Sequence, residues 1–151
     1  MKKVMYIFVF ISSFISCFAQ GSDDFFLKGK RKYDSKDYVG AIPYFTICIN
    51  TSDGMEISAL LLRGISKLKL NDYRGAISDL DKVISYKEGG YISEISEVKA
   101  IRMTLFGGED YYYRGFAKLK LGYLESGCLD LSKAGESGYT RAYNLISIYC
   151  K

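Results

Sequence analysis

The sequence predicts an all-α protein, and two observations lead to this prediction. A pattern recurs along the chain: residues 36–49 read KDYVGAIPYFTICI and residues 71–84 read NDYRGAISDLDKVI, a shift of 35 positions (71 − 36). A third, weaker copy covers residues 122–135. Within the copies, apolar residues follow helical spacing, as at Ala76 and Leu80. A recurring helical unit is typical of proteins built from stacked helices.

Each unit is predicted to contain two helices. The segments before the three copies also align, with a glycine in the same slot at Gly29, Gly64 and Gly115. Glycine lowers helix propensity, so its recurrence within a helix suggests that two helices approach closely at this slot. Asp37 and Asp72 stand where the second helix should begin, because a carboxylate there can cap free backbone N–H groups.

An insertion displaces the third copy. Gly64 and Gly115 are 51 positions apart (115 − 64), about 17 more than a period of ~34 residues. The extra segment spans residues 87–110, and its apolar residues from Ile92 to Leu105 follow one helical face. We expect an amphipathic helix there, which packs on the side of the stack, lies across its groove or offers a face that binds a partner.

The repeated pattern resembles the tetratricopeptide repeat family, and the final segment at residues 131–150 resembles Sel1-like repeats. The resemblance implies a right-handed solenoid of about three helix pairs, with the inserted helix and a C-terminal capping helix. The matching residues are Gly29, Asp37, Tyr38, Ala41, Ile42 and Phe45; Leu60, Gly64, Leu70, Asp72, Tyr73, Ala76 and Leu80; and Tyr111, Gly115, Leu121 and Leu131, with Gly127 replacing the usual alanine. The expected units are a signal peptide at 1–19 and a repeat domain at 20–151, with repeats at about 22–52, 57–88 and 108–136 and the capping helix at 138–150.

The resemblance also implies a concave groove lined by the first helix of each pair. The positions that correspond are mostly apolar or aromatic: Phe26, Lys30, Tyr33, Leu61, Ile65, Leu68, Tyr112, Phe116 and Leu119. An exposed patch of this kind would mark a binding site for a protein or peptide segment, unless the inserted helix or a tight superhelix fills it. Some family members grip a peptide's C-terminal carboxylate with lysines and asparagines. Apolar and aromatic residues replace those asparagines here, so an apolar or amphipathic peptide is expected.

The first twenty residues are predicted to export the protein. Lys2 and Lys3 precede a nearly continuous apolar run at residues 4–15, which is shorter than the ~20 residues of a membrane-spanning helix. Cleavage after Ala19 would release a periplasmic or secreted protein. The segment before Cys17 instead resembles a bacterial lipobox, which would leave Cys17 lipidated and the protein anchored to a membrane.

The composition disfavours catalysis and nucleic-acid binding. The chain has no histidine, which excludes histidine-based nucleophile activation and histidine-ligated metal sites. Its formal charge of +4 includes two leader lysines, and the remainder is too small for an electrostatic nucleic-acid binder. We therefore expect no enzyme, no cofactor and no metal, but a binding scaffold or adaptor of the bacterial envelope. The alternative is a structural or assembly lipoprotein anchored through Cys17.

The remaining cysteines suggest one disulfide. Cys48 falls in a core slot and should be a buried small hydrophobe. Cys128 should face the C-terminal helix that carries Cys150, and an oxidising compartment permits a bridge between them. Simple antiparallel pairing, however, places Cys150 about 9 Å past the level of Cys128. The sequence therefore leaves this bridge open.

Overall fold

The computed structural model describes residues 22–51, 55–89 and 107–151, and the regular elements in these ranges are all α-helices. The all-α prediction is confirmed for these ranges. The leader with Cys17, and the helix expected between Ile92 and Leu105, lie outside them. No helix among the described residues is long and apolar enough to cross a membrane. The helices are α2 (Ser22–Asp34), α3 (Tyr38–Thr51), α4 (Glu56–Lys69), α5 (Tyr73–Glu88), α8 (Glu109–Lys120), α9 (Leu124–Glu136) and α10 (Ala142–Tyr149).

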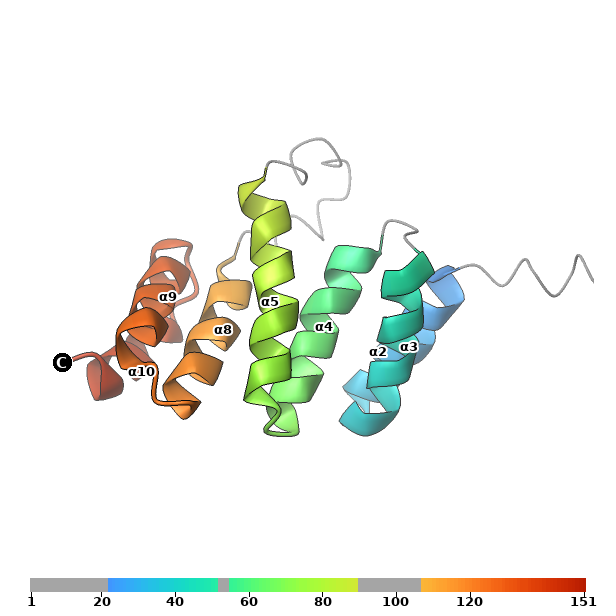
Figure 1. Ribbon diagram of the computed structural model, residues 1–151, viewed down its shortest axis with the longest axis horizontal. Helices are drawn as coiled ribbons and strands as arrows, with labels where there is room; N and C mark the ends of the chain where they lie inside the picture. The colour runs from blue at the N-terminus through green and yellow to red at the C-terminus, as the bar shows by residue number, and fades with distance from the viewer. Residues whose placement is uncertain (1–21, 52–54, 90–106) are drawn as a thin grey trace, which may run out of the picture.

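The helices stand side by side in a row, and each packs against the next along the chain (Figure 1). Helix α4 also contacts α2 and α8, the first helices of the neighbouring pairs. The first helices of the three pairs therefore share one face of the row.

The three turns within the pairs have the same geometry. Lys36, Asn71 and Gly122 occupy one slot of the repeat, and all three have a positive φ, at 64°, 63° and 83°. In the first two turns the predicted N-caps are confirmed. The Asp37 carboxylate accepts a hydrogen bond from the backbone N–H of Gly40, and Asp72 accepts one from Gly75, both at 2.9 Å.

The glycine slot marks a close contact between the helices of a pair. A Cβ at Gly115 would lie 2.9 Å from the backbone oxygen of Gly127, a distance that real Cβ atoms do not reach. At Gly64 the nearest atom would be in the Leu80 side chain, at 3.2 Å. The expected close approach is confirmed. In the third pair it is tight enough that glycine stands on both helices.

The capping helix begins later than the sequence suggested. It starts at Ala142, not at residue 138, because Gly138 adopts a positive φ of 93° and residues 139–141 form a turn. Cys150 then lies eight residues from the start of α10 (150 − 142), and Cys128 lies eight from the end of α9 (136 − 128). The two cysteines reach the same level and form a disulfide, with Cα atoms 5.6 Å apart.

Candidate functional site

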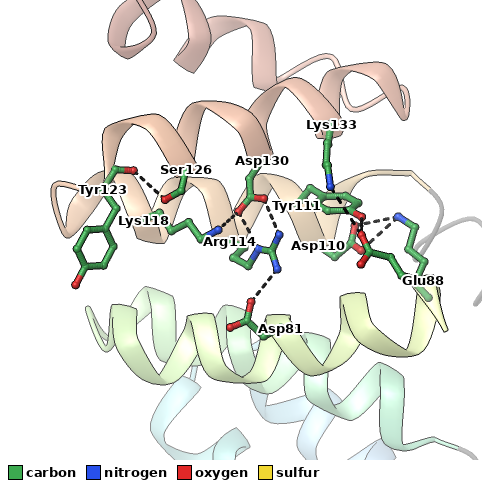
Figure 2. Close-up of polar contacts among 11 residues, drawn as sticks. Asp81, Glu88, Asp110, Tyr111, Arg114, Lys118, Tyr123, Ser126, Asp130 and Lys133 are labelled. Carbon is green, nitrogen blue, oxygen red and sulfur yellow. Dashed lines mark hydrogen bonds and ion pairs between the residues drawn. The ribbon is translucent and has the colours of Figure 1, made fainter.

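A buried carboxylate joins the two helices of the third pair (Figure 2). Asp130 of α9 accepts two hydrogen bonds from the guanidinium of Arg114 of α8, at 2.8 and 2.6 Å. It also pairs with Lys118 at 2.8 Å. Only 3% of the Asp130 side chain is exposed. Two cations on α8 therefore compensate one desolvated carboxylate on α9, as a buried charge requires.

The second pair repeats this cluster. Asp79 of α5 accepts two hydrogen bonds from Arg63 of α4, at 2.9 and 2.7 Å, and pairs with Lys67 at 2.8 Å. The first pair does not, because Tyr44 stands in the carboxylate's slot. There Lys28, in the arginine's slot, pairs instead with Asp24 on its own helix.

Both arginines also reach back to the preceding pair. Arg63 donates to the hydroxyl of Thr46 at 3.0 Å, and Arg114 donates to the carboxylate of Asp81 at 2.8 Å. Thr46 and Asp81 occupy the same slot of the repeat, 35 residues apart (81 − 46). The contacting residues are 17 positions apart in the first case and 33 in the second, so the second pair of residues is separated by 16 more positions (33 − 17). In both places the arginine nevertheless contacts the same slot of the preceding pair.

A second polar cluster lies where α5 meets the start of α8. The Tyr111 hydroxyl donates to Glu88 at 2.7 Å, and the fully buried carboxylate of Asp110 pairs with Lys87 at 3.3 Å. Burial raises the pKa of Asp110, and Lys87 only partly offsets this. These groups compensate one another within the helix interface, so we assign them to the packing of α5 against α8.

Four tyrosines pack against the core but keep part of their surface exposed. We call Tyr33, Tyr112, Tyr113 and Tyr139 the aromatic face. The rings of Tyr112 and Tyr113 lie 5.2 Å apart and those of Tyr112 and Tyr139 lie 4.7 Å apart, between centroids. Tyr33 of α2 and Tyr113 of α8 both pack against the core cluster that contains Leu61, so the aromatic face extends across α4.

The aromatic face is partly desolvated. Burial raises the pKa of Tyr33 to about 12, with a smaller contribution from the charge of Glu109. Burial also raises the pKa of Tyr113, and the nearby phenols of Tyr139 and Tyr33 add to the effect. The pKa of the Glu109 carboxyl is raised as well, chiefly by burial. Half-buried tyrosines suit a binding face, because their rings offer apolar area and their hydroxyls offer hydrogen bonds.

Replacing Tyr33 by phenylalanine is expected to change the stability only at alkaline pH. A phenol titrates at about 10 in an unfolded chain, but Tyr33 titrates at about 12 in the folded protein. The unfolded chain therefore loses the phenolic proton first, and the folded protein loses stability as the pH rises from ~10 through the folded pKa. Urea unfolding between pH 10 and pH 12 should show a steeper loss of stability for the unmodified protein than for Tyr33→Phe. Parallel curves would contradict the raised pKa.

The structure changes the expected groove. Leu61, Ile65, Leu68 and Leu119 are at most 9% exposed, and all four belong to core clusters, so they do not line an open groove. The physical reason is that helices pack on both sides of α4 and α8, so their apolar stripes are used in the core. The other predicted groove residues retain some exposure: Phe26, Lys30, Tyr33, Tyr112 and Phe116. Lys30 is paired with Asp34 at 2.8 Å.

Sequence reasoning missed Tyr113 and Tyr139 on the aromatic face and the two buried aspartates. The aspartates had a signal in the sequence, because each follows the arginine of an Arg-Gly pair by 16 residues (79 − 63 and 130 − 114). The tyrosines had none, since Tyr113 stands in a run of three tyrosines whose spacing does not single out one of them.

A comparison with protein families, curated proteins and solved structures finds no match to this chain.

Proposed function

We propose that this protein is a peptide- or protein-binding scaffold of the bacterial cell envelope, and that it binds its partner on the aromatic face. The observation that carries the proposal is the group of Tyr33, Tyr112, Tyr113 and Tyr139: the Tyr112 ring contacts those of Tyr113 and Tyr139, Tyr33 and Tyr113 pack against the same core cluster, and all four keep exposed surface. Tyrosines that are partly exposed and held by packing are enriched where proteins bind one another, since little side-chain entropy is lost on binding.

The proposed scaffold is a solenoid of three helix pairs of the tetratricopeptide type. The recurring turn geometry, the glycine slot and the arginine contacts between successive pairs support it. In such a solenoid the first helices line the inner surface, so the aromatic face would lie there. The buried ion pairs hold the two helices of a pair together, and the same arginines contact the preceding pair, so the binding face is rigid before a partner arrives.

The aromatic face suits an extended peptide that carries apolar or aromatic side chains. Its rings supply stacking and apolar contact. The four cations at the interfaces within the second and third pairs are already paired with Asp79 and Asp130: Arg63, Lys67, Arg114 and Lys118. Recognition by a cluster of cations is therefore disfavoured, and the partner should contribute apolar side chains and backbone hydrogen-bonding groups. Export by the leader, which lies outside the described residues, would place the protein in the periplasm or outside the cell.

Peptide selection tests the proposal. The protein, purified after expression of the full chain, is used to select ligands from a random peptide library, and dissociation constants are measured for the selected peptides. Tyr112→Ala should weaken their binding by about tenfold or more, because it removes a ring that contacts two others. The matched control is Tyr123→Ala at the α8–α9 turn, where the tyrosine is exposed and away from the aromatic face. If the two substitutions weaken binding equally, the aromatic face is not the site.

A further inference from the structure

A partly buried carboxylate begins helix α8, beside the aromatic face. Glu109 is the first residue of α8, and Tyr112, Tyr113 and Phe116 follow it at 3, 4 and 7 positions (112 − 109, 113 − 109 and 116 − 109). These spacings place the four side chains on one face of the helix. All four residues keep part of their surface exposed. The open side of α8 therefore combines one carboxylate with three aromatic rings.

The charge of Glu109 acts on tyrosines of two helices. Burial is the main cause of the raised pKa values of Tyr33 and Tyr113, and the charge of Glu109 adds to both. Tyr33 belongs to α2 and Tyr113 to α8. The carboxylate therefore lies close to the aromatic face as a whole, and not only to the side chains of its own helix.

Glu109 lacks the counter-charge that the buried aspartates have. Asp79, Asp110 and Asp130 are each paired with at least one cation. Within the described part of the chain, no ion pair or hydrogen bond reaches the Glu109 side chain. Burial and the charge of Asp110 raise the pKa of Glu109, and Arg141 offsets only part of this effect. A cation brought by a partner would stabilise a partly desolvated carboxylate of this kind.

Cations already contact aromatic rings of α8 within the protein. The ammonium of Lys120 lies 5.3 Å from the centre of the Phe116 ring, on the same helix face as Glu109. On another side of the helix, the ammonium of Lys133 lies 5.3 Å from the centre of the Tyr111 ring. Lys120 is 11 positions from Glu109 (120 − 109), which is roughly 16 Å along the helix. Its contact with Phe116 therefore leaves Glu109 without a counter-charge.

We propose that the aromatic face binds a basic side chain of its peptide, a lysine or an arginine, whose cation contacts the Glu109 carboxylate and the rings of Tyr112 and Tyr113. The carboxylate accepts charge-assisted hydrogen bonds, and the electron-rich faces of the rings attract the cation. This inference rests on the proposed function and adds the charge of the partner to it. The peptide is then amphipathic, with apolar side chains beside at least one basic residue.

A matched control separates this role from a general effect of acidic residues on helices. Glu109 lies at the positive end of the α8 dipole, where an acidic side chain stabilises the helix whether or not a partner binds. Glu125 lies in the first turn of α9 in the same way, but it is exposed and lines a depression with Tyr149 and Cys150, away from the aromatic face. Glu125→Gln is therefore the control for Glu109→Gln.

Paired peptides test the proposal on protein purified after expression of the full chain. A peptide selected from the random library is synthesised with its basic residue and with norleucine in that place, which keeps an aliphatic side chain but removes the charge. For the unmodified protein and for Glu125→Gln, norleucine should raise the dissociation constant by about tenfold. For Glu109→Gln the difference should fall to about threefold, because only the rings still favour the cation. Circular dichroism checks that both variants remain folded.

An undiminished difference between the two peptides in Glu109→Gln would overturn the proposal. Selected peptides that bind the aromatic face without a basic residue would overturn it as well. In both cases, weaker binding to Tyr112→Ala would still support the proposed function. If Tyr112→Ala binds as tightly as the unmodified protein, or if the library yields no peptide, the proposed function fails and this inference fails with it.

Discussion

Replacing Asp130 by asparagine is expected to lower the free energy of unfolding by about 3 kcal/mol. The amide keeps the shape of the side chain but leaves the guanidinium of Arg114 and the ammonium of Lys118 without their buried counter-charge. Breaking a buried pair by removing one partner costs this much because the remaining charge stays desolvated. Urea unfolding at neutral pH measures the loss.

Asp81→Asn is the control for this prediction. Asp81 pairs with the same guanidinium at 2.8 Å, but its side chain is 53% exposed. Solvent screens an exposed pair, so this substitution should cost less than about 1 kcal/mol. If Asp130→Asn and Asp81→Asn lower the free energy of unfolding equally, burial does not determine the strength of these ion pairs. Our account of how they hold the helices together is then wrong.

Replacing Cys128 and Cys150 together by serine is expected to lower the stability by about 3 kcal/mol. The disulfide closes a loop between residues 22 positions apart, and opening it gives the unfolded chain more conformations. Thermal unfolding without reductant should show a lower midpoint for the double variant. Because Ala142 is the only buried residue of α10, hydrogen exchange should rise first in residues 142–149.

A reductant provides the internal control. It should lower the midpoint of the unmodified protein toward that of the double variant and leave the variant itself unchanged. Equal midpoints for both proteins without reductant would mean that packing alone holds α10 in place.

The helix pairs could be predicted from sequence because their signals are local. The spacing of Ala76 and Leu80 and the capping carboxylate of Asp72 each act within one or two turns of helix. The start of α10 was misplaced because it depends on the turn at Gly138, whose positive φ the sequence pattern did not reveal.

The binding face could be predicted only in part, since it depends on how neighbouring helices cover one another. The resemblance to tetratricopeptide repeats assigned Leu61 and Tyr112 alike to the groove. In the structure, Leu61 is buried between adjacent helices while Tyr112 keeps exposed surface. A helical period identifies an apolar stripe but not which part of that stripe a third helix covers. Tyr139 joins the aromatic face from the turn before α10, whereas the sequence placed it within the capping helix.

Nuclear magnetic resonance of the tyrosine rings tests the central claim most directly. The protein is labelled on its tyrosines and titrated with a peptide selected from the library, and the shift of each ring signal is followed. We predict that the shifts concentrate on Tyr33, Tyr112, Tyr113 and Tyr139 and that Tyr73 and Tyr123, near the turns within the pairs, stay unchanged. Shifts confined to Tyr73 and Tyr123, with the aromatic face unaffected, would contradict our assignment of the binding site.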